Sequence, residues 1–134
     1  MLYLFKKRYF SKPYFLRYRP IILISSPVSI IEKKIYLKKI KKINTKIHLI
    51  KIDVNGYELP VIKGLAKIIK RDKPALIVET GEDIKIIYKY LKKYGFEKYL
   101  FLNKYNKFMK IKKKYPLNTY FLQRNHLKLR VTWL

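Results

Sequence analysis

The chain has 134 residues, of which 33 are basic and eight acidic, and its formal net charge at pH 7 is +25. It contains no cysteine, which excludes disulfides, thiolate metal sites and a cysteine nucleophile. Its two histidines, His48 and His126, are far apart in the sequence, so we expect no metal site. The length predicts one domain with a buried core, and the lack of cysteine is compatible with the cytoplasmic location that we expect.

Two interpretations of the charge are open. Lysine supplies 27 of the 33 basic residues and is spread along the chain. Such a distribution is typical of lysine that serves only as a solvated surface residue. A protein this basic can also bind nucleic acid by neutralising its phosphates. No membrane span is expected, because the apolar run at residues 21–31 is short and contains Pro27.

The first 45 residues form a basic and aromatic N-terminal segment. Within it, residues 1–20 show no regular pattern, and residues 21–25 are compatible with a short strand. Isoleucine and leucine recur at helical intervals over residues 30–43, which predicts an amphipathic helix with lysines on its outer face.

A strand–helix–strand pattern follows this segment. Residues 46–54 and 75–80 are apolar runs of the kind that forms buried strands. Between them, residues 58–70 carry apolar side chains at helical spacing, with Pro60 in the first turn. We therefore predict a helix there that ends before Pro74.

After the second strand, a helix is predicted from Ile84 to Leu91, with Asp83 as its N-terminal cap and Gly95 at its C-terminal end. Three more strands are predicted at residues 96–102, 107–111 and 118–124. These elements make a domain over residues 46–124, and residues 125–134 form a tail.

The order of elements predicts an α/β fold. Two strands joined by one helix form a βαβ unit with parallel strands. We expect a doubly wound, mostly parallel sheet that finishes with an antiparallel strand. In an open sheet of this kind, ligands bind at the carboxyl ends of the strands.

Acidic residues gather in the βαβ unit and just after it. Asp53 and Glu79 end its two strands, and Glu58 begins the helix between them. Because the carboxyl ends of parallel strands share one edge, we expect a site there. Structural roles are also open. Asp53 or Asn55 can cap the helix, and the negative charge of Glu58 can be stabilised by the positive N-terminus of the helix. Glu79 can simply be a solvated residue at the end of a strand. The six acidic residues of this region are Asp53, Glu58, Asp72, Glu79, Glu82 and Asp83.

The stretch over residues 49–80 resembles the signature segment of the FkbM family of S-adenosylmethionine-dependent methyltransferases. Residues 91–97 and 118–124 are similar to the closing elements of that family, so the resemblance covers residues 46–124. The matching positions of the signature are Lys51, Ile52, Asp53, Val54, Gly56, Tyr57, Glu58, Lys63, Gly64, Pro74 and Glu79.

The resemblance implies a Rossmann-like class I methyltransferase sheet, in which residues 49–54 are the fourth strand and 75–80 the fifth. It implies methyl transfer from S-adenosylmethionine, often to a hydroxyl group of a sugar or another small molecule. Under this interpretation the catalytic candidates are Asp53, which orients the acceptor or acts as base, and Glu58. Asn55 and Glu79 are the candidates for acceptor binding.

The chain departs from the family pattern in two ways. Asn55 stands where the family has a glutamate, and an amide cannot act as a base. The chain also has only four glycines and no G-x-G, so it lacks the glycine-rich turn on which the cofactor of such enzymes rests. Residues 1–45 are too short for the three strands that come first in the family. We therefore expect the C-terminal half of the fold alone, with no binding of S-adenosylmethionine by this chain by itself.

Three hypotheses follow. The first is a truncated or degenerate methyltransferase of this family. The second is a small basic nucleic-acid-binding protein, supported by the interleaved tyrosine, phenylalanine and lysine at residues 1–20 and 99–115. The third is a half-domain that pairs with a complementing chain through an exposed strand edge.

Overall fold

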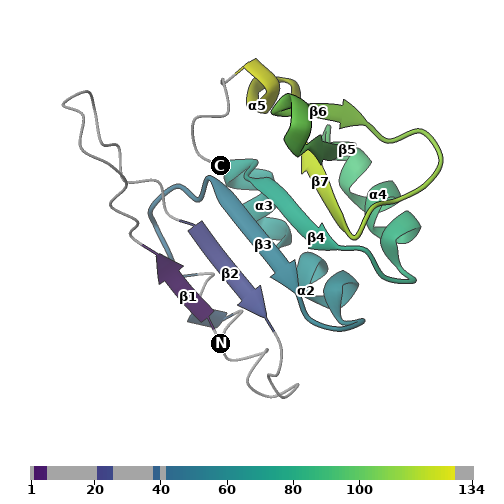
Figure 1. Ribbon diagram of the computed structural model, residues 1–134. Helices are drawn as coiled ribbons and strands as arrows, with labels where there is room; N and C mark the ends of the chain where they lie inside the picture. Colours follow the sequence, from purple (N-terminus) through teal and green to yellow (C-terminus); the bar gives the residue numbers. More distant parts are fainter. Residues whose placement is uncertain (1, 6–20, 26–37, 40–41, 129–134) are drawn as a thin grey trace.

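The computed structural model describes residues 2–5, 21–25, 38–39 and 42–128. These residues form one mixed sheet with helices (Figure 1). The strands are β1 (Leu2–Phe5), β2 (Ile21–Ser25), β3 (Leu49–Asp53), β4 (Ala75–Glu79), β5 (Glu97–Leu102), β6 (Lys107–Lys110) and β7 (Asn118–Leu122). The helices are α2 (Glu58–Gly64), α3 (Ala66–Asp72), α4 (Ile84–Lys92) and α5 (Arg124–Lys128), with a 3-10 turn η1 (Asn103–Tyr105).

The strands lie in the order β1-β2-β3-β4-β7-β5-β6. The parallel pairing of β3 with β4 is confirmed, and β2 lies parallel to β3 on the other side. The last strand, β7, lies between β4 and β5 and is antiparallel to both, which confirms the antiparallel finish. The expectation of a mostly parallel sheet is wrong outside this centre, because β1–β2 and β5–β6 are also antiparallel pairs.

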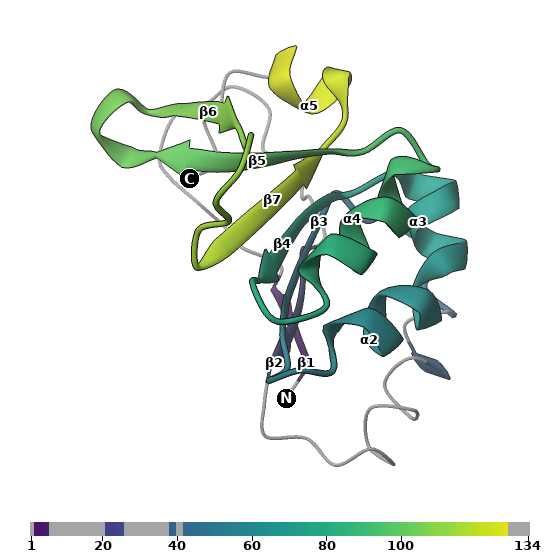
Figure 2. The ribbon, with the colours of Figure 1, turned by 90° about the vertical axis from the view of Figure 1, so that its right-hand side faces the viewer.

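Helices α2, α3 and α4 all lie on one face of the sheet (Figure 2). The prediction of a doubly wound sheet, with helices on both faces, is therefore wrong for the part of the chain that the structure describes. One helical layer is what the amphipathic pattern of these helices needs, since a single apolar face is buried against the strands.

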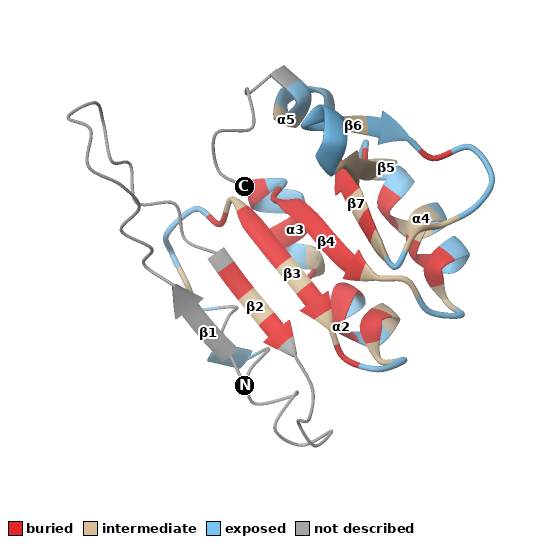
Figure 3. Ribbon diagram, in the orientation of Figure 1, coloured by how far each residue is buried: buried red, intermediate tan, exposed pale blue. Residues whose placement is uncertain are grey.

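The main core lies between the sheet and this helical layer. Ile50, Ile52 and Val78 point from β3 and β4 toward the helices and are fully buried, and Ile62 and Ile69 meet them from α2 and α3. Figure 3 shows β4 as buried along nearly its whole length. Burying each such side chain contributes about 1.5–3 kcal/mol, so this layer is the principal source of stability.

The opposite face of the sheet carries a smaller apolar cluster. Because side chains alternate along a strand, the residues between those of the main core point this way. The cluster consists of Leu49, Ala75, Ile77 and Leu122, with Tyr99, Phe108 and Tyr120 packed against it. Asp53 and Glu79 follow the same alternation and therefore belong to this face.

The helix predicted over residues 58–70 forms as two segments, α2 and α3. Leu65, between them, is fully buried but has φ −89° and ψ 3°, outside the α-helical range. Its N–H still bonds to the carbonyl of Val61, so the two segments follow one path. The second segment is capped by Lys73, which has a left-handed conformation with φ 49° and donates its N–H to the carbonyl of Ile69, a common way for a helix to end.

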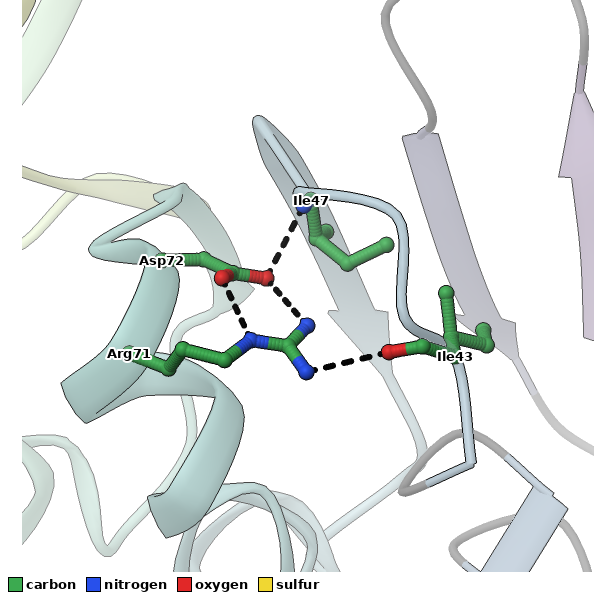
Figure 4. A network of polar contacts seen from close by, with 4 residues as sticks. All are labelled: Ile43, Ile47, Arg71 and Asp72. Carbon is green, nitrogen blue, oxygen red and sulfur yellow. Dashed lines mark hydrogen bonds and ion pairs between the residues drawn. The ribbon is translucent and has the colours of Figure 1, made fainter.

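The C-terminal end of α3 is tied to the chain that leads into β3 (Figure 4). Arg71 donates from Nε and Nη2 to the carboxylate of Asp72, at 2.6 and 2.7 Å. Asp72 also accepts the backbone N–H of Ile47 at 2.9 Å, and Arg71 donates to the carbonyl oxygen of Ile43 at 3.0 Å. This network holds residues 43–47 against the helix at the amino end of the central strands.

Near the two ends of the chain, the structure differs from several predictions made from the sequence. The strand at 21–25 is confirmed as β2, but the sequence missed β1 at 2–5, which pairs with it. Of the helix predicted over 30–43, only Lys38 and Lys39 are described as helical; residues 42 and 43 are not, and the remainder lies outside the described residues. The tail predicted from residue 125 contains most of α5.

Candidate functional site

The candidate site lies where β3 and β4 end. Ile52 and Val78 are register partners, so Asp53 and Glu79, which follow them, end the two strands side by side. Both side chains are partly exposed, on the face of the sheet opposite α2–α4. The expectation that two neighbouring strands bring carboxylates to one edge agrees with this register.

Asp53 and Glu79 interact directly. A hydrogen bond between the two carboxyl groups raises the pKa of Glu79, and the negative charge of Asp53, partial burial and the charge of Glu58 raise it further. The positive charge of Lys51 acts in the opposite direction but does not offset them. Because the two carboxyl groups interact this closely, a proton bound by one affects the binding of a proton by the other.

Glu58 is buried, with 3% of its surface exposed. Its Oε1 accepts the backbone N–H groups of Val54 and Gly56, each at 3.2 Å. The other oxygen faces Gly81, where a Cβ would lie 3.7 Å from Oε2. Glu58 therefore holds the turn after β3 in place next to the residues that follow β4.

The turn after β3 explains the identity of Asn55. The N–H of Tyr57 bonds to the carbonyl of Val54, and the two residues between them have positive φ, 46° at Asn55 and 84° at Gly56. Asn followed by Gly is the pair that such a turn prefers, because both tolerate the left-handed region. Asn55 is exposed at the tip of this turn, beside the carboxylate pair in sequence.

The structural alternatives raised for these residues have mixed outcomes. Helix α2 has Tyr57 as its N-cap, without a side-chain cap, so neither Asp53 nor Asn55 caps it. Glu58 does lie in the first turn of α2, where a negative charge is favourable. Asp83 is the N-cap residue of α4, but its side chain makes no capping bond.

The sequence missed the contribution of β7 to this edge. Asn118 is the register partner of Glu79. Thr80, which follows Glu79, also bonds to β7 and to the residue before it. Its hydroxyl group lies 2.8 Å from that of Thr119, and its N–H donates to the carbonyl of Leu117 at 2.7 Å. Only the strand order could have indicated this, since nothing in the sequence places the last strand next to β4.

The acidic residues of the 53–83 region do not all come together. Asp72 lies at the other end of the sheet, bound to Arg71 and Ile47. Among the described residues no group of three or more histidine, aspartate or glutamate side chains is arranged to hold a metal ion.

The two histidines, distant in sequence, influence each other in the fold. Burial lowers the pKa of His126, and the nearby charges of His48 and Lys46 add to this. His126 accepts the N–H of Gln123 at Nδ1, and its Nε2 lies 3.0 Å from the carbonyl of Lys73, so this histidine is a neutral structural residue.

Comparisons with known proteins identify the family of the chain. A sequence model of the methyltransferase FkbM domain matches residues 14–98, which is more than half of the chain and includes β3, α2, α3 and β4. No curated protein and no solved structure matches the chain. In the described part of the chain, no helix has the length and apolar character that crossing a membrane requires.

Proposed function

Because the chain belongs to the FkbM family of methyltransferases, we propose that the end of β3 and β4 is the acceptor side of a methyl-transfer site. The acceptor is a hydroxyl group of a sugar or another small molecule, as the family resemblance implies. The observation that carries this proposal is the register of β3 and β4, which places Asp53 and Glu79 side by side at the ends of adjacent strands. A carboxyl group whose pKa is raised by a neighbouring carboxyl group, as that of Glu79 is, is typical of functional sites.

The proposal gives the two carboxyl groups different roles. Methyl transfer to a hydroxyl releases one proton, and a carboxylate within hydrogen-bond reach can accept it. Asp53 is the candidate base, because it ends the central strand β3 beside Glu79, whose pKa is raised. Glu79 orients Asp53 and lines the acceptor site.

Glu58 and Asn55 support this pair from the turn after β3. Glu58 was a catalytic candidate from the sequence, but we propose that it is a positioning residue, since its Oε1 is occupied by two backbone N–H groups. Asn55 lies exposed at the rim, where its amide can bind an acceptor but cannot remove a proton.

The residues of this chain do not fit the cofactor site that the family implies. In this type of sheet the first strand neighbours the fourth, which gives that position to β2, the parallel neighbour of β3. The residues that follow β2 in sequence, 26–31, contain no glycine. The next position is taken by β1, which is antiparallel, and no acidic residue occurs before Glu32 to hold a ribose.

We therefore propose that this chain does not hold S-adenosylmethionine by itself, and that methyl transfer needs a complementing chain with the glycine-rich turn. Of the two edge strands of the described sheet, β1 and β6, the one available for such a chain is β1, because it lies beside β2, on the side of the sheet where the cofactor strands belong. We place the protein in the cytoplasm, in keeping with the absence of cysteine.

The experiment is a calorimetric titration of the full chain with S-adenosylmethionine. No binding heat is expected up to millimolar cofactor, and micromolar binding would contradict the proposal. Size-exclusion chromatography of the same sample reports whether the chain is monomeric before any partner is added.

A further inference from the structure

The hairpin formed by β5, η1 and β6, with the loop that leads into β7, is the most basic continuous part of the described chain. We call residues 98–117 the basic hairpin. It carries seven lysines, and no acidic residue occurs anywhere after Glu97. The seven are Lys98, Lys104, Lys107, Lys110, Lys112, Lys113 and Lys114.

Two of these lysines have structural partners. Lys98 donates to the hydroxyl of Tyr115 at 3.1 Å and lies over the rings of Tyr88 and Tyr115. Lys110 forms an ion pair with Glu97 at 3.4 Å. The other five are exposed and make no ion pair with any residue that the structure describes.

An aromatic ring lies among the five lysines without an ion pair. Tyr105, in η1 at the tip of the hairpin, is 61% exposed. The ammonium groups of Lys104 and Lys107 lie 5.6 and 5.5 Å from the centre of its ring. An exposed ring flanked by two cations presents one stacking surface and two phosphate-binding groups within a few ångströms.

The base of the hairpin is rigid. Phe108 packs against Phe101 and Tyr120 with ring centroids 5.0 and 5.2 Å apart, so the ribbon is fixed to the sheet by aromatic contacts. Lysine on the edge strand β6 can serve simply to prevent edge pairing. That role does not account for Lys112–Lys114, which lie in a loop, or for the exposure of Tyr105.

From these observations we propose that the basic hairpin binds single-stranded nucleic acid. A base stacks on Tyr105, Lys104 and Lys107 neutralise the phosphates beside it, and Lys112–Lys114 neutralise the phosphates that follow. An anionic membrane suits this surface less well, because Met109 and Leu117 are exposed singly and form no apolar face to insert. The inference does not depend on the proposed methyl-transfer function.

The test measures the fluorescence anisotropy of labelled oligo-uridine RNA and oligo-thymidine DNA, about 12 nucleotides each, with the full chain at about 150 mM salt. The Lys112→Ala/Lys113→Ala/Lys114→Ala variant should bind at least roughly tenfold more weakly. It should also reduce the slope of log affinity against log salt by about 2. The matched control, Lys85→Ala/Lys89→Ala/Lys93→Ala, removes the same charge from exposed positions at α4 and should lose less than about threefold.

The stacking contact is tested separately. Tyr105→Ala should weaken binding roughly fivefold or more, whereas Tyr105→Phe, which keeps the ring, should bind like the unmodified chain. Equal losses in the two triple-lysine variants, or an unchanged affinity in Tyr105→Ala, would overturn the proposal. It would also be overturned by tighter binding to phosphatidylserine vesicles that the oligonucleotides fail to displace.

Discussion

The pKa of an acidic side chain is shifted in opposite directions at the two ends of β3 and β4. At the amino end, burial by itself raises the pKa of Asp72. The hydrogen bonds from Arg71 and Ile47 and the nearby positive charges outweigh burial, and the pKa is lowered. At the carboxyl end, Glu79 faces Asp53, and its pKa is raised. The same sheet thus holds one satisfied carboxylate and one pair of carboxyl groups that repel each other when both are ionised.

The opposite shifts indicate different roles for the two ends: the carboxylate at the amino end stabilises the fold, and we propose that the pair at the carboxyl end serves function. A carboxylate that accepts a guanidinium and a buried N–H stabilises the fold. Two adjoining carboxyl groups do not, and natural proteins keep such arrangements mainly where a site requires them. The comparison therefore predicts that loss of the Asp72 carboxylate at the amino end costs stability, whereas loss of the Asp53 or Glu79 carboxyl group at the carboxyl end does not.

The largest effect is expected from Asp72→Ala. This change removes the acceptor of the Ile47 N–H, a buried group, and leaves Arg71 without its carboxylate. We expect the free energy of unfolding to fall by about 1–3 kcal/mol in urea denaturation.

The control for Asp72→Ala is Glu82→Ala, at an exposed position. This variant should change the free energy of unfolding by less than about 0.5 kcal/mol. Equal effects of the two variants would remove the distinction between the two ends of the sheet.

A smaller effect is expected at the turn after β3. Asn55→Glu restores the family residue but forces a glutamate to a φ of 46°, and should cost about 1 kcal/mol in free energy of unfolding. Asn55→Gly, which adopts that φ readily, should be near neutral. If both variants unfold at the same urea concentration, the positive φ of this turn is not the reason for an asparagine at position 55.

The smallest effect is a pH dependence at the amino end, where His126 contacts the carbonyl of Lys73. Burial lowers the pKa of His126, so the unfolded chain binds the proton more readily than the folded chain. The stability contribution of neutral His126 is present above about pH 6.5 and is lost as pH falls toward the lowered pKa. Thermal unfolding between pH 7.5 and 5.5 should show a loss that His126→Leu reduces; an identical loss in this variant would contradict the assignment.

Much of the fold could be predicted from apolar periodicity. The runs at 46–54 and 75–80 gave two central strands, and the helical spacing between them gave the path of α2 and α3. The break at Leu65 was missed, although Gly64 directly before it is a residue of low helix propensity, because the apolar spacing continues through this position. Strand β1 was missed, since four residues within a basic, aromatic stretch carry too little pattern to identify a strand.

For the candidate site, the sequence placed Asp53 and Glu79 at one edge because strand direction alone decides it. The role of Glu58 depended on a turn geometry with two positive φ values, which a glutamate in a first helical turn does not reveal. Asp72 was counted among the acidic residues of the 53–83 region because it is close to the others in sequence. The length of α3 carries it to the opposite end of the sheet.

The most direct test of the account is a carbon-13 NMR titration of the carboxyl groups in the full chain and in Asp53→Asn. In the unmodified chain, the pKa of Glu79 should lie above its ordinary value of 4.5. In Asp53→Asn it should return toward that value, because the neighbouring charge is gone. An ordinary pKa for Glu79 in the unmodified chain, or a raised pKa that Asp53→Asn leaves unchanged, would contradict the claim that these two carboxyl groups form one site.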